Sequence, residues 1–249
     1  ANLLAAGRFI STGHEIDRND NVLCVLPIYH INGMCVTVMG TIVSASTLVI
    51  PHKFSVNSFW KTIAKFKCSW FSAVPTQFSY ILNNEEVPKD LSSLRFARSA
   101  SAPLSPDIHK KFEKRFGIPI IETMGLTETG SQITTNPMPP GQRKIGSPGK
   151  AYGNQIMIGD DHFEALPAGK TGEILVKGDN VMQGYFKQPE ETHKTILGNG
   201  WLRTGDLGYL DTDGYVFVSG RIKELIIKGG ENIAPREIDE ALLNHPSIL

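Results

Sequence analysis

Residues 200–239 read GWLRTGDLGYLDTDGYVFVSGRIKELIIKGGENIAPREID, and this stretch determines how the rest of the chain is interpreted. Apolar residues alternate with others over 206–210 and again over 215–218. The acidic and glycine residues of 211–214 separate the two runs. Alternating runs joined by an Asp-Gly turn are typical of a β-hairpin, which we therefore predict here.

Two clusters of small and hydroxyl residues precede the hairpin, SASAPLSP at 99–106 and ETMGLTETG at 122–130. Each cluster follows a short apolar run, 94–97 and 118–121 respectively, which predicts a buried strand. In open α/β sheets, ligands bind in the crevice outside the carboxyl ends of the strands. We therefore expect both clusters to line a ligand crevice.

The chain contains three further motifs: LPIYHINGM at 26–34, GEILVKG at 172–178 and GYFKQPEET at 184–192. Together with the two clusters and the hairpin, they resemble the adenylate-forming superfamily of AMP-forming acyl-CoA synthetases, peptide-synthetase adenylation domains and luciferases. The resemblance covers the chain from residue 26 onward. It implies an α/β fold with a β/α-layered portion of the large adenylate-forming domain, a small β-rich subdomain and the start of a C-terminal α+β domain.

The domain limits follow from the same resemblance. We expect a partial N-terminal AMP-binding domain at 1–221, with its β/α part at about 1–140 and its β-rich part at about 141–221. The beginning of a truncated C-terminal domain is expected at 222–249.

Length and composition agree with a piece of a soluble enzyme. The 249 residues are 41% hydrophobic and 20% charged, which is sufficient for a buried core. A formal net charge of +0 argues against a nucleic-acid-binding surface, which needs a basic patch. Cys24, Cys35 and Cys68 lie far apart without metal-ligand spacing, so we expect buried free thiols and a cytoplasmic location.

One uncharged stretch, between Asp20 and Lys53, is long enough to suggest a membrane span. Proline, asparagine and serine interrupt it, and its pieces fit a globular core better. We predict a buried strand, a core helix and another buried strand, at 22–26, 34–44 and 47–50. The remaining stretch to residue 120 alternates helix and strand patterns: a helix capped by Ser55, a strand at 69–74, a helix at 75–82 and a helix at 106–116 capped by Ser105.

Adenylation makes a carboxylate attack the α-phosphate of ATP, so the site needs Mg²⁺ and hydrogen-bond donors around a crowded anionic centre. The resemblance implies that Thr127 donates to the α-phosphate and that Glu128 holds the magnesium. The alternative is structural, because Thr-Glu pairs often start helices, where the acid complements the helix dipole.

The resemblance also assigns the nucleotide contacts. Asp206 matches the residue that accepts from both ribose hydroxyls, and Arg221 the cation near ribose and phosphate. Many relatives carry tyrosine where this chain has Met124, whose thioether can still pack on a ring. The adenine would lie among Ser101, Ala102, Pro103, Glu122, Thr123, Met124, Gly125, Leu126 and Thr127.

Three further roles are implied. His30 would border the acyl pocket, with a buried core histidine as the alternative. Lys223 would be the hinge between an adenylating and a thioester-forming pose, with an exposed strand lysine as the alternative. Gly229 and Gly230 would flank the pantetheine tunnel of a CoA ligase.

The acyl pocket would take an extended chain, because the residues at Ser101 and Gly125 are small. A medium or long fatty acid is therefore slightly favoured over an aryl or short acid.

The chain resembles a partial enzyme. Asn2-Leu3-Leu4 resembles the segment just after the family's phosphate-cradling loop, and the family's catalytic lysine would come after Leu249. We therefore expect the chain to be inactive alone.

We expect the parent to be an AMP-forming acid–thiol ligase that uses ATP, Mg²⁺ and coenzyme A on a small-molecule carboxylic acid. Two alternatives stay open: an adenylation enzyme that loads a carrier protein, and a non-catalytic truncated nucleotide-binding module.

Overall fold

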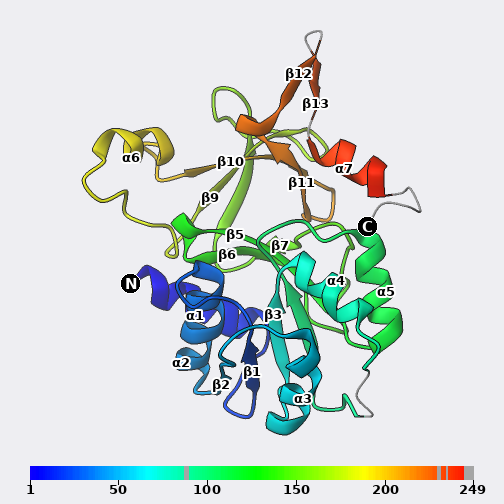
Figure 1. The fold of residues 1–249 in the computed structure, drawn as a ribbon. Coiled ribbons are helices and arrows are strands. Elements are labelled where there is room, and N and C mark those ends of the chain that lie inside the picture. The colour runs from blue at the N-terminus through cyan, green and yellow to red at the C-terminus, as the bar shows by residue number, and fades with distance from the viewer. Residues whose placement is uncertain (87–89, 229–230, 234, 244–249) are drawn as a thin grey trace. The chain divides into compact units, whose positions relative to one another are not determined.

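A computed structural model describes residues 1–86, 90–228, 231–233 and 235–243 (Figure 1). The chain divides into two compact units. The first contains residues 1–153 together with 178–182, and the second contains 154–177 and the chain from Gln183 onward. The segment 178–182 therefore belongs to the first unit although the chain on both sides of it belongs to the second.

A seven-stranded sheet forms the centre of the first unit, in the order β2-β1-β3-β4-β5-β6-β7. The pairs from β2 to β5 are parallel, whereas β6 and β7 are antiparallel to their neighbours. The strand order reverses between β1 and β3, where such folds bind ligands. The strands are β1 (Asn21–Cys24), β2 (Thr47–Val49), β3 (Trp70–Ala73), β4 (Phe96–Ser99), β5 (Ile120–Leu126), β6 (Ser131–Thr135) and β7 (Lys150–Ala151).

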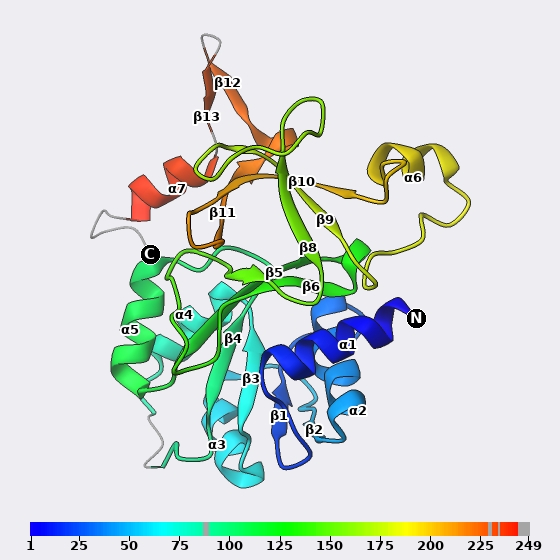
Figure 2. The same ribbon diagram turned by 180° about the vertical axis from the view of Figure 1, so that it is seen from behind.

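Helices cover both faces of this sheet, and two hydrophobic clusters hold them there. One cluster packs α3 (Val56–Phe66), α4 (Pro75–Asn83) and α5 (Pro106–Phe116) on one face through residues such as Phe71. The other packs α1 (Asn2–Gly13) and the π-helix η1 (Asn32–Met39) on the opposite face. The helix α2 (Gly40–Ser44) continues η1 and lies against α1 (Figure 2). Full burial of each large apolar side chain contributes about 1.5–3 kcal/mol.

Local sequence signals explain where helix α5 begins and ends. Ser105 occupies its N-cap position and Pro106 its first turn, where the missing proline N–H costs nothing. Asp107 lies in the first turn, which suits the helix dipole. Gly117 ends the helix with a left-handed φ of 67°. The predicted bounds 106–116 are confirmed.

The uncharged stretch also folds into the predicted pieces, as β1, the continuous helix of η1 and α2, and β2. Among the described residues, no helix is long and apolar enough to cross a membrane. Cys24, Cys35 and Cys68 are buried and free, as predicted.

Strand β5 differs from the prediction. The strand expected at 118–121 continues to Leu126, because its second half pairs with β6 instead of ending at the sheet edge. The cluster at 122–130 therefore forms the end of a strand and the short 3₁₀ helix η2 (Thr127–Thr129), rather than a loop after the strand.

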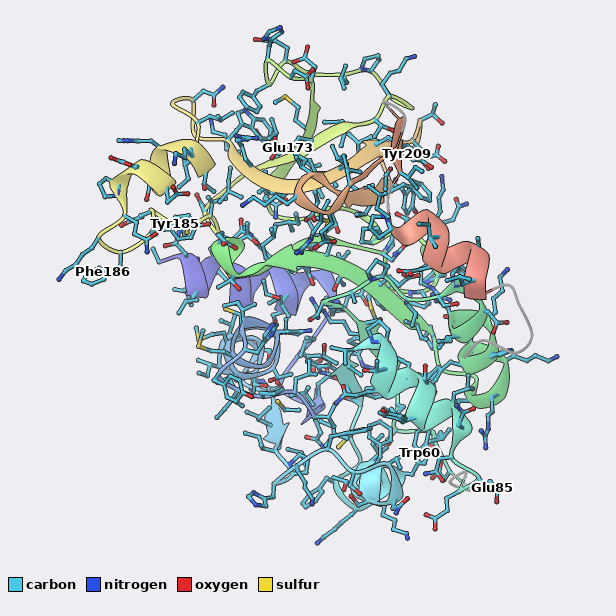
Figure 3. The ribbon with its side chains drawn as sticks, turned by 45° about the horizontal axis from the view of Figure 1, so that its top comes forward. Trp60, Glu85, Glu173, Tyr185, Phe186 and Tyr209 are labelled. Carbon is cyan, nitrogen blue, oxygen red and sulfur yellow. The ribbon has the colours of Figure 1, made fainter. Side chains whose placement is uncertain are left out.

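The second unit contains a four-stranded antiparallel sheet in the order β11-β10-β9-β8. The predicted hairpin is confirmed as β10 and β11, which pair antiparallel. Phe186, which precedes α6, points away from the ribbon (Figure 3). The elements are β8 (Gln155–Gly159), β9 (Gly172–Lys177), α6 (Pro189–Thr195), β10 (Leu202–Leu210), β11 (Val216–Arg221), η3 (Ile222–Glu224), β12 (Ile226–Lys228), β13 (Glu231–Ile233) and α7 (Pro235–Leu243).

The parallel sheet with helices on both faces and the separate antiparallel sheet confirm the predicted α/β fold class. The domain limits at about residue 140 and at residue 221 stay predictions. The strand β7, at Lys150–Ala151, pairs with β6 and so belongs to the sheet of the first unit.

Candidate functional site

The carboxyl edge of the parallel sheet carries two of the predicted acyl-pocket residues. His30 lies in the segment after β1, and Ser101 lies in the loop after β4. Asn32 connects them: its backbone N–H donates to His30 Nδ1 over 3.2 Å, and its Nδ2 donates to Ser101 Oγ over 3.0 Å. His30 is exposed, so it is not a buried core histidine.

Arg98 lies beneath Asn32 and is 1% exposed. Its Nη1 donates to Asn32 Oδ1 over 2.9 Å and to Ser72 Oγ over 3.1 Å. Its Nη2 donates to Gln132 Oε1 over 3.4 Å. Burial lowers the pKa of Arg98 to about 9, so the guanidinium stays charged at neutral pH.

The loop after β4 has an unusual backbone. Ser101 has a φ of +74°, in the left-handed region that a serine seldom adopts. Ser101, Ala102 and Pro103 are all exposed. Their predicted contact with adenine stays a prediction, and the open loop leaves their backbone groups accessible to a ligand.

The second half of β5 is fixed by close contacts. A Cβ on Gly125 would lie 1.5 Å from the carbonyl oxygen of Ser131, so only glycine lets β5 and β6 approach here. The small size of Gly125 is therefore used for strand packing and does not by itself leave room for an acyl chain. Met124 and Leu126 are half-buried.

The side chains of Glu122 and Thr123 are buried and face protein groups. Glu122 Oε1 hydrogen-bonds with His109 Nδ1 at 2.9 Å and accepts from the backbone N–H of Gly146 at 3.1 Å. Thr123 Oγ1 donates to the carbonyl oxygen of Ser99 over 3.3 Å. A nucleotide contact at these two positions would therefore involve the backbone.

Thr127 and Glu128 begin η2, as the structural alternative also expects, yet Thr127 is exposed and Glu128 half-buried. The turn is held by Thr129, whose Oγ1 accepts from the backbone N–H of Leu126 over 3.2 Å. Since this bond closes the turn, the Thr127 hydroxyl is presented by a fixed backbone.

The segment 178–182 holds the turn from outside. Asn180 Nδ2 donates to the carbonyl oxygens of Thr129 and Gln132, over 2.9 and 3.1 Å. The N–H of Met182 donates to the carbonyl oxygen of Glu128 over 2.7 Å. Asn2 Nδ2 in turn donates to the carbonyl oxygen of Asp179 over 2.9 Å and anchors the segment to α1.

Glu128 is the candidate magnesium ligand. No group of three or more metal-ligating side chains occurs in the part of the chain that the structure describes. Magnesium is usually bound by one or two carboxylates together with phosphates and water. A single carboxylate next to a hydroxyl that is predicted to bind phosphate would fit magnesium that arrives with ATP.

In the second unit, Asp206 and Arg221 are cross-strand partners in the hairpin. Asp206 is buried, and its Oδ1 accepts from Arg221 Nε over 2.9 Å. Burial raises the pKa of Asp206, and the Arg221 guanidinium acts in the opposite direction. The two residues assigned to the ribose therefore form one charged pair.

Glu173 fixes the backbone next to Asp206. It lies on β9, in the antiparallel sheet (Figure 3), and accepts from the N–H of Gly205 over 3.0 Å and from Arg203 Nε over 3.0 Å. Lys223 is exposed in η3, so it is not a strand lysine. Gly229 and Gly230, the predicted tunnel residues, lie outside the described residues.

Sequence reasoning missed residues that hold the candidate residues in place: Asn32, Arg98 and Asn180 in the first unit, and Glu173 in the second. Arg98 had a signal, since it is a charged residue inside an apolar strand and directly precedes SASAPLSP. The sequence gives no signal for Asn180, because its partner Thr129 lies 51 residues earlier in the chain.

Comparison with known proteins gives a consistent result. The family model described as AMP-binding enzyme matches residues 1–186. A sulfoacetate–CoA ligase from Cupriavidus necator is 50% identical over 248 residues, which cover 100% of this chain and 48% of that protein. The chain therefore spans about half the length of the curated relatives it matches.

Solved structures agree. The crystal structure of ATP-bound MatB from Rhodopseudomonas palustris has a TM-score of 0.94 at 32% identity and covers 100% of this chain and 49% of that one. The O-succinylbenzoate coenzyme A synthetase MenE from Bacillus subtilis, in complex with ATP and magnesium ion, has a TM-score of 0.89 at 33% identity, with 100% and 51% covered.

Proposed function

Because the chain belongs to the family of AMP-binding enzymes, we propose that the whole protein is an AMP-forming acid–CoA ligase. In the first step a carboxylate oxygen attacks the α-phosphorus of ATP, which forms acyl-AMP and releases pyrophosphate. In the second step the thiolate of coenzyme A attacks the acyl carbon and releases AMP. The observation that carries the proposal is the fixed turn that presents Thr127 and Glu128 next to each other.

The chain's own residues have distinct tasks in the first step. Thr127 donates its hydroxyl to the α-phosphate, where negative charge develops. Glu128 holds magnesium, which neutralises phosphate charge when bound. The adenine is placed by the backbone of 101–103 and 122–126, and the ribose by Asp206 with Arg221 beside it.

The choice of acid needs revision. The fatty acid favoured by the sequence depends on room at Ser101 and Gly125, but Gly125 packs against Ser131 and Ser101 is hydrogen-bonded to Asn32. The name of the Cupriavidus necator relative specifies a short acid, sulfoacetate. We therefore favour a compact acid over a long aliphatic one.

Coenzyme A is proposed as the acceptor, since the relatives named above are CoA ligases or synthetases. A carrier protein is the alternative acceptor. The three buried free thiols support the proposal of a reducing compartment such as the cytoplasm.

The test uses the purified whole protein with ATP, Mg²⁺ and a panel of acids. We expect acid-dependent pyrophosphate release, and acyl-CoA only when coenzyme A is added. Release without acyl-CoA formation would favour the carrier-protein alternative. Nucleotide binding without acid-dependent release would favour a non-catalytic module.

A substitution of Thr127 tests whether the turn takes part in the reaction. Thr127→Ala should lower kcat/KM for pyrophosphate release roughly 10- to 150-fold, the equivalent of one charge-assisted hydrogen bond of about 1.5–3 kcal/mol. Thr212→Ala, in the exposed hairpin turn of the second unit, is the matched control and should leave the rate unchanged. Equal activity of the two variants would remove Thr127 from the mechanism.

A further inference from the structure

Arg98 is a buried cation whose hydrogen-bond partners are all neutral. Its Nη1 and Nη2 donate to Asn32, Ser72 and Gln132, and its Nε has no partner. No carboxylate of the described residues forms an ion pair with it. Burial lowers its pKa to about 9. The guanidinium is therefore charged and uncompensated.

A histidine near Arg98 adds no negative charge. His14 lies near it, buried and stacked on Phe96 with ring centroids 5.5 Å apart. Burial, followed by the charge of Arg98, lowers the pKa of His14 to about 3, so this histidine is neutral at physiological pH. An uncompensated buried charge is costly, and its field attracts an anion to any accessible point nearby.

Asn32 connects this cation to the surface of the carboxyl edge. Its Oδ1 faces Arg98 and its Nδ2 donates to Ser101 Oγ, so the amide dipole is aligned with the guanidinium charge. Since Ser101 Oγ accepts from Asn32, its own proton is available for an outside acceptor. Ser101 is exposed, so that acceptor can come from solvent.

His30 provides a second donor at the same edge. Its Nδ1 accepts from the backbone N–H of Asn32, which leaves the ring proton of the neutral histidine on Nε2. His30 is exposed as well. Two donors therefore reach solvent above a buried positive charge, and both are oriented by Asn32.

We propose that Arg98, acting through Asn32 and Ser101, selects acids that carry a second anionic group, a carboxylate or a sulfonate, in addition to the carboxylate that reacts. The inference rests on the proposed ligase function and names its substrate class. Arg98 and Asn32 are positioning residues, and Ser101 and His30 are the groups that contact the second anion.

The reacting carboxylate is a poorer match for this cation. It loses its charge when it forms acyl-AMP, so a fixed positive charge that binds it would stabilise the ground state and oppose the reaction. A second anion keeps its charge through both steps. Its interaction with Arg98 and Ser101 is equal in ground and transition state, which predicts an effect on KM rather than on kcat.

The test introduces a negative charge next to Arg98 by a single substitution. Asn32→Asp places a carboxylate where Arg98 already donates, so the pair is compensated and the fold is expected to melt at or above the wild-type temperature. The probes are malonate, succinate and sulfoacetate, each compared with an acid of similar shape without the second charge, such as the monoamides of malonate and succinate. Asn57→Asp, at an exposed position on α3, is the control for the charge change.

For the wild type we expect kcat/KM at least 10-fold higher with the second charge than without it. Asn32→Asp should lower that ratio at least 10-fold, because KM rises more for the dianionic acids than for the monoamides. Ser101→Ala should lower it by a smaller factor, and Asn57→Asp should leave it unchanged. A purely structural role for Arg98 and Asn32 would instead change both kinds of acid alike.

Either of two results would overturn the inference: a wild-type enzyme that activates uncharged-tail acids as well as their dianionic counterparts, or an unchanged preference in a folded Asn32→Asp variant. Both leave the ligase function standing. Failure of every acid to release pyrophosphate would instead contradict the proposed function itself.

Discussion

Replacing Gly125 by alanine tests whether this position serves strand packing or acyl binding. The added Cβ would lie 1.5 Å from the carbonyl oxygen of Ser131, whereas ordinary van der Waals contact begins at 3.4 Å. The strands β5 and β6 would therefore have to separate locally by about 1.9 Å. That separation would disrupt the pairing of Gly125 with Gln132 and of Leu126 with Ser131.

The expected cost combines two contributions. Overpacking a closely packed site costs about 1–3 kcal/mol, and each backbone hydrogen bond lost adds about 0.5–1.5 kcal/mol. A total of about 3 kcal/mol corresponds to a fall in Tm of roughly 6–12 °C for a domain of this size. Gly198→Ala is the matched control, because a Cβ there meets nothing within 4 Å, and its stability should stay within about 0.5 kcal/mol of the wild type.

Thermal unfolding of the whole protein, followed by circular dichroism, measures both variants. Activity toward acids of increasing chain length is measured on the same samples. If Gly125→Ala melts at the wild-type temperature and shifts the preference to shorter acids, Gly125 lines the acyl pocket. That outcome would refute the packing argument and restore the fatty acid as the favoured substrate.

Three further perturbations address the nucleotide, the hinge and the buried histidine. Asp206→Ala should cost roughly 2–4 kcal/mol of transition-state binding, since about two charge-assisted hydrogen bonds to ribose are lost, and wild-type pyrophosphate exchange in this variant would exclude the assignment. Lys223→Pro fixes φ and should lower thioester formation while acyl-AMP formation survives; equal loss of both, with the fold intact, would mark Lys223 as structural. Burial lowers the pKa of His14 in the folded protein from its ordinary value of 6.5 to about 3. Between pH 6.5 and pH 3 the unfolded chain therefore binds a proton at His14 and the folded protein does not. The free energy of unfolding consequently falls as pH falls through this range, by up to roughly 1.4 kcal/mol per pH unit. His14→Phe should flatten this slope in urea unfolding, and an unchanged slope would contradict the assignment.

The sequence predicted elements whose ends are set by local chemistry. The helix α5 begins at Pro106 after Ser105 and ends before Gly117, and all three signals are visible without a structure. The hairpin of β10 and β11 likewise follows from its Asp-Gly turn. Strand β5 extends beyond the predicted strand because the apolar run ends at Ile121, whereas the pairing of residues 123–126 with β6 depends on a contact that the sequence does not display.

The candidate site residues also fall into two groups, those that motifs indicate and those that only the folded structure shows. Thr127, Ser101 and His30 are exposed and were predicted from motifs, because their chemical types stand out, and their roles stay predictions. Asn32 and Arg98 were missed, since a buried polar network depends on side chains from separate strands that meet only in the folded state. Their importance comes from charge and burial, which a motif does not contain.

The segment 178–182 has a consequence for synthesis on the ribosome. The carbonyl oxygen of Thr129 accepts a hydrogen bond from Asn180, 51 residues later in the chain. Asn2 donates to the carbonyl oxygen of Asp179, which is made 177 residues after it. At a translation rate of roughly 5–20 residues per second, the turn at Thr127 stays without its outer support for about 3–10 s after it has been made. The last strand of the first sheet ends at Ala151, so all strands of that sheet are made before Asn180. A pause in translation between Thr129 and Asn180 would lengthen the time for which the turn lacks these partners.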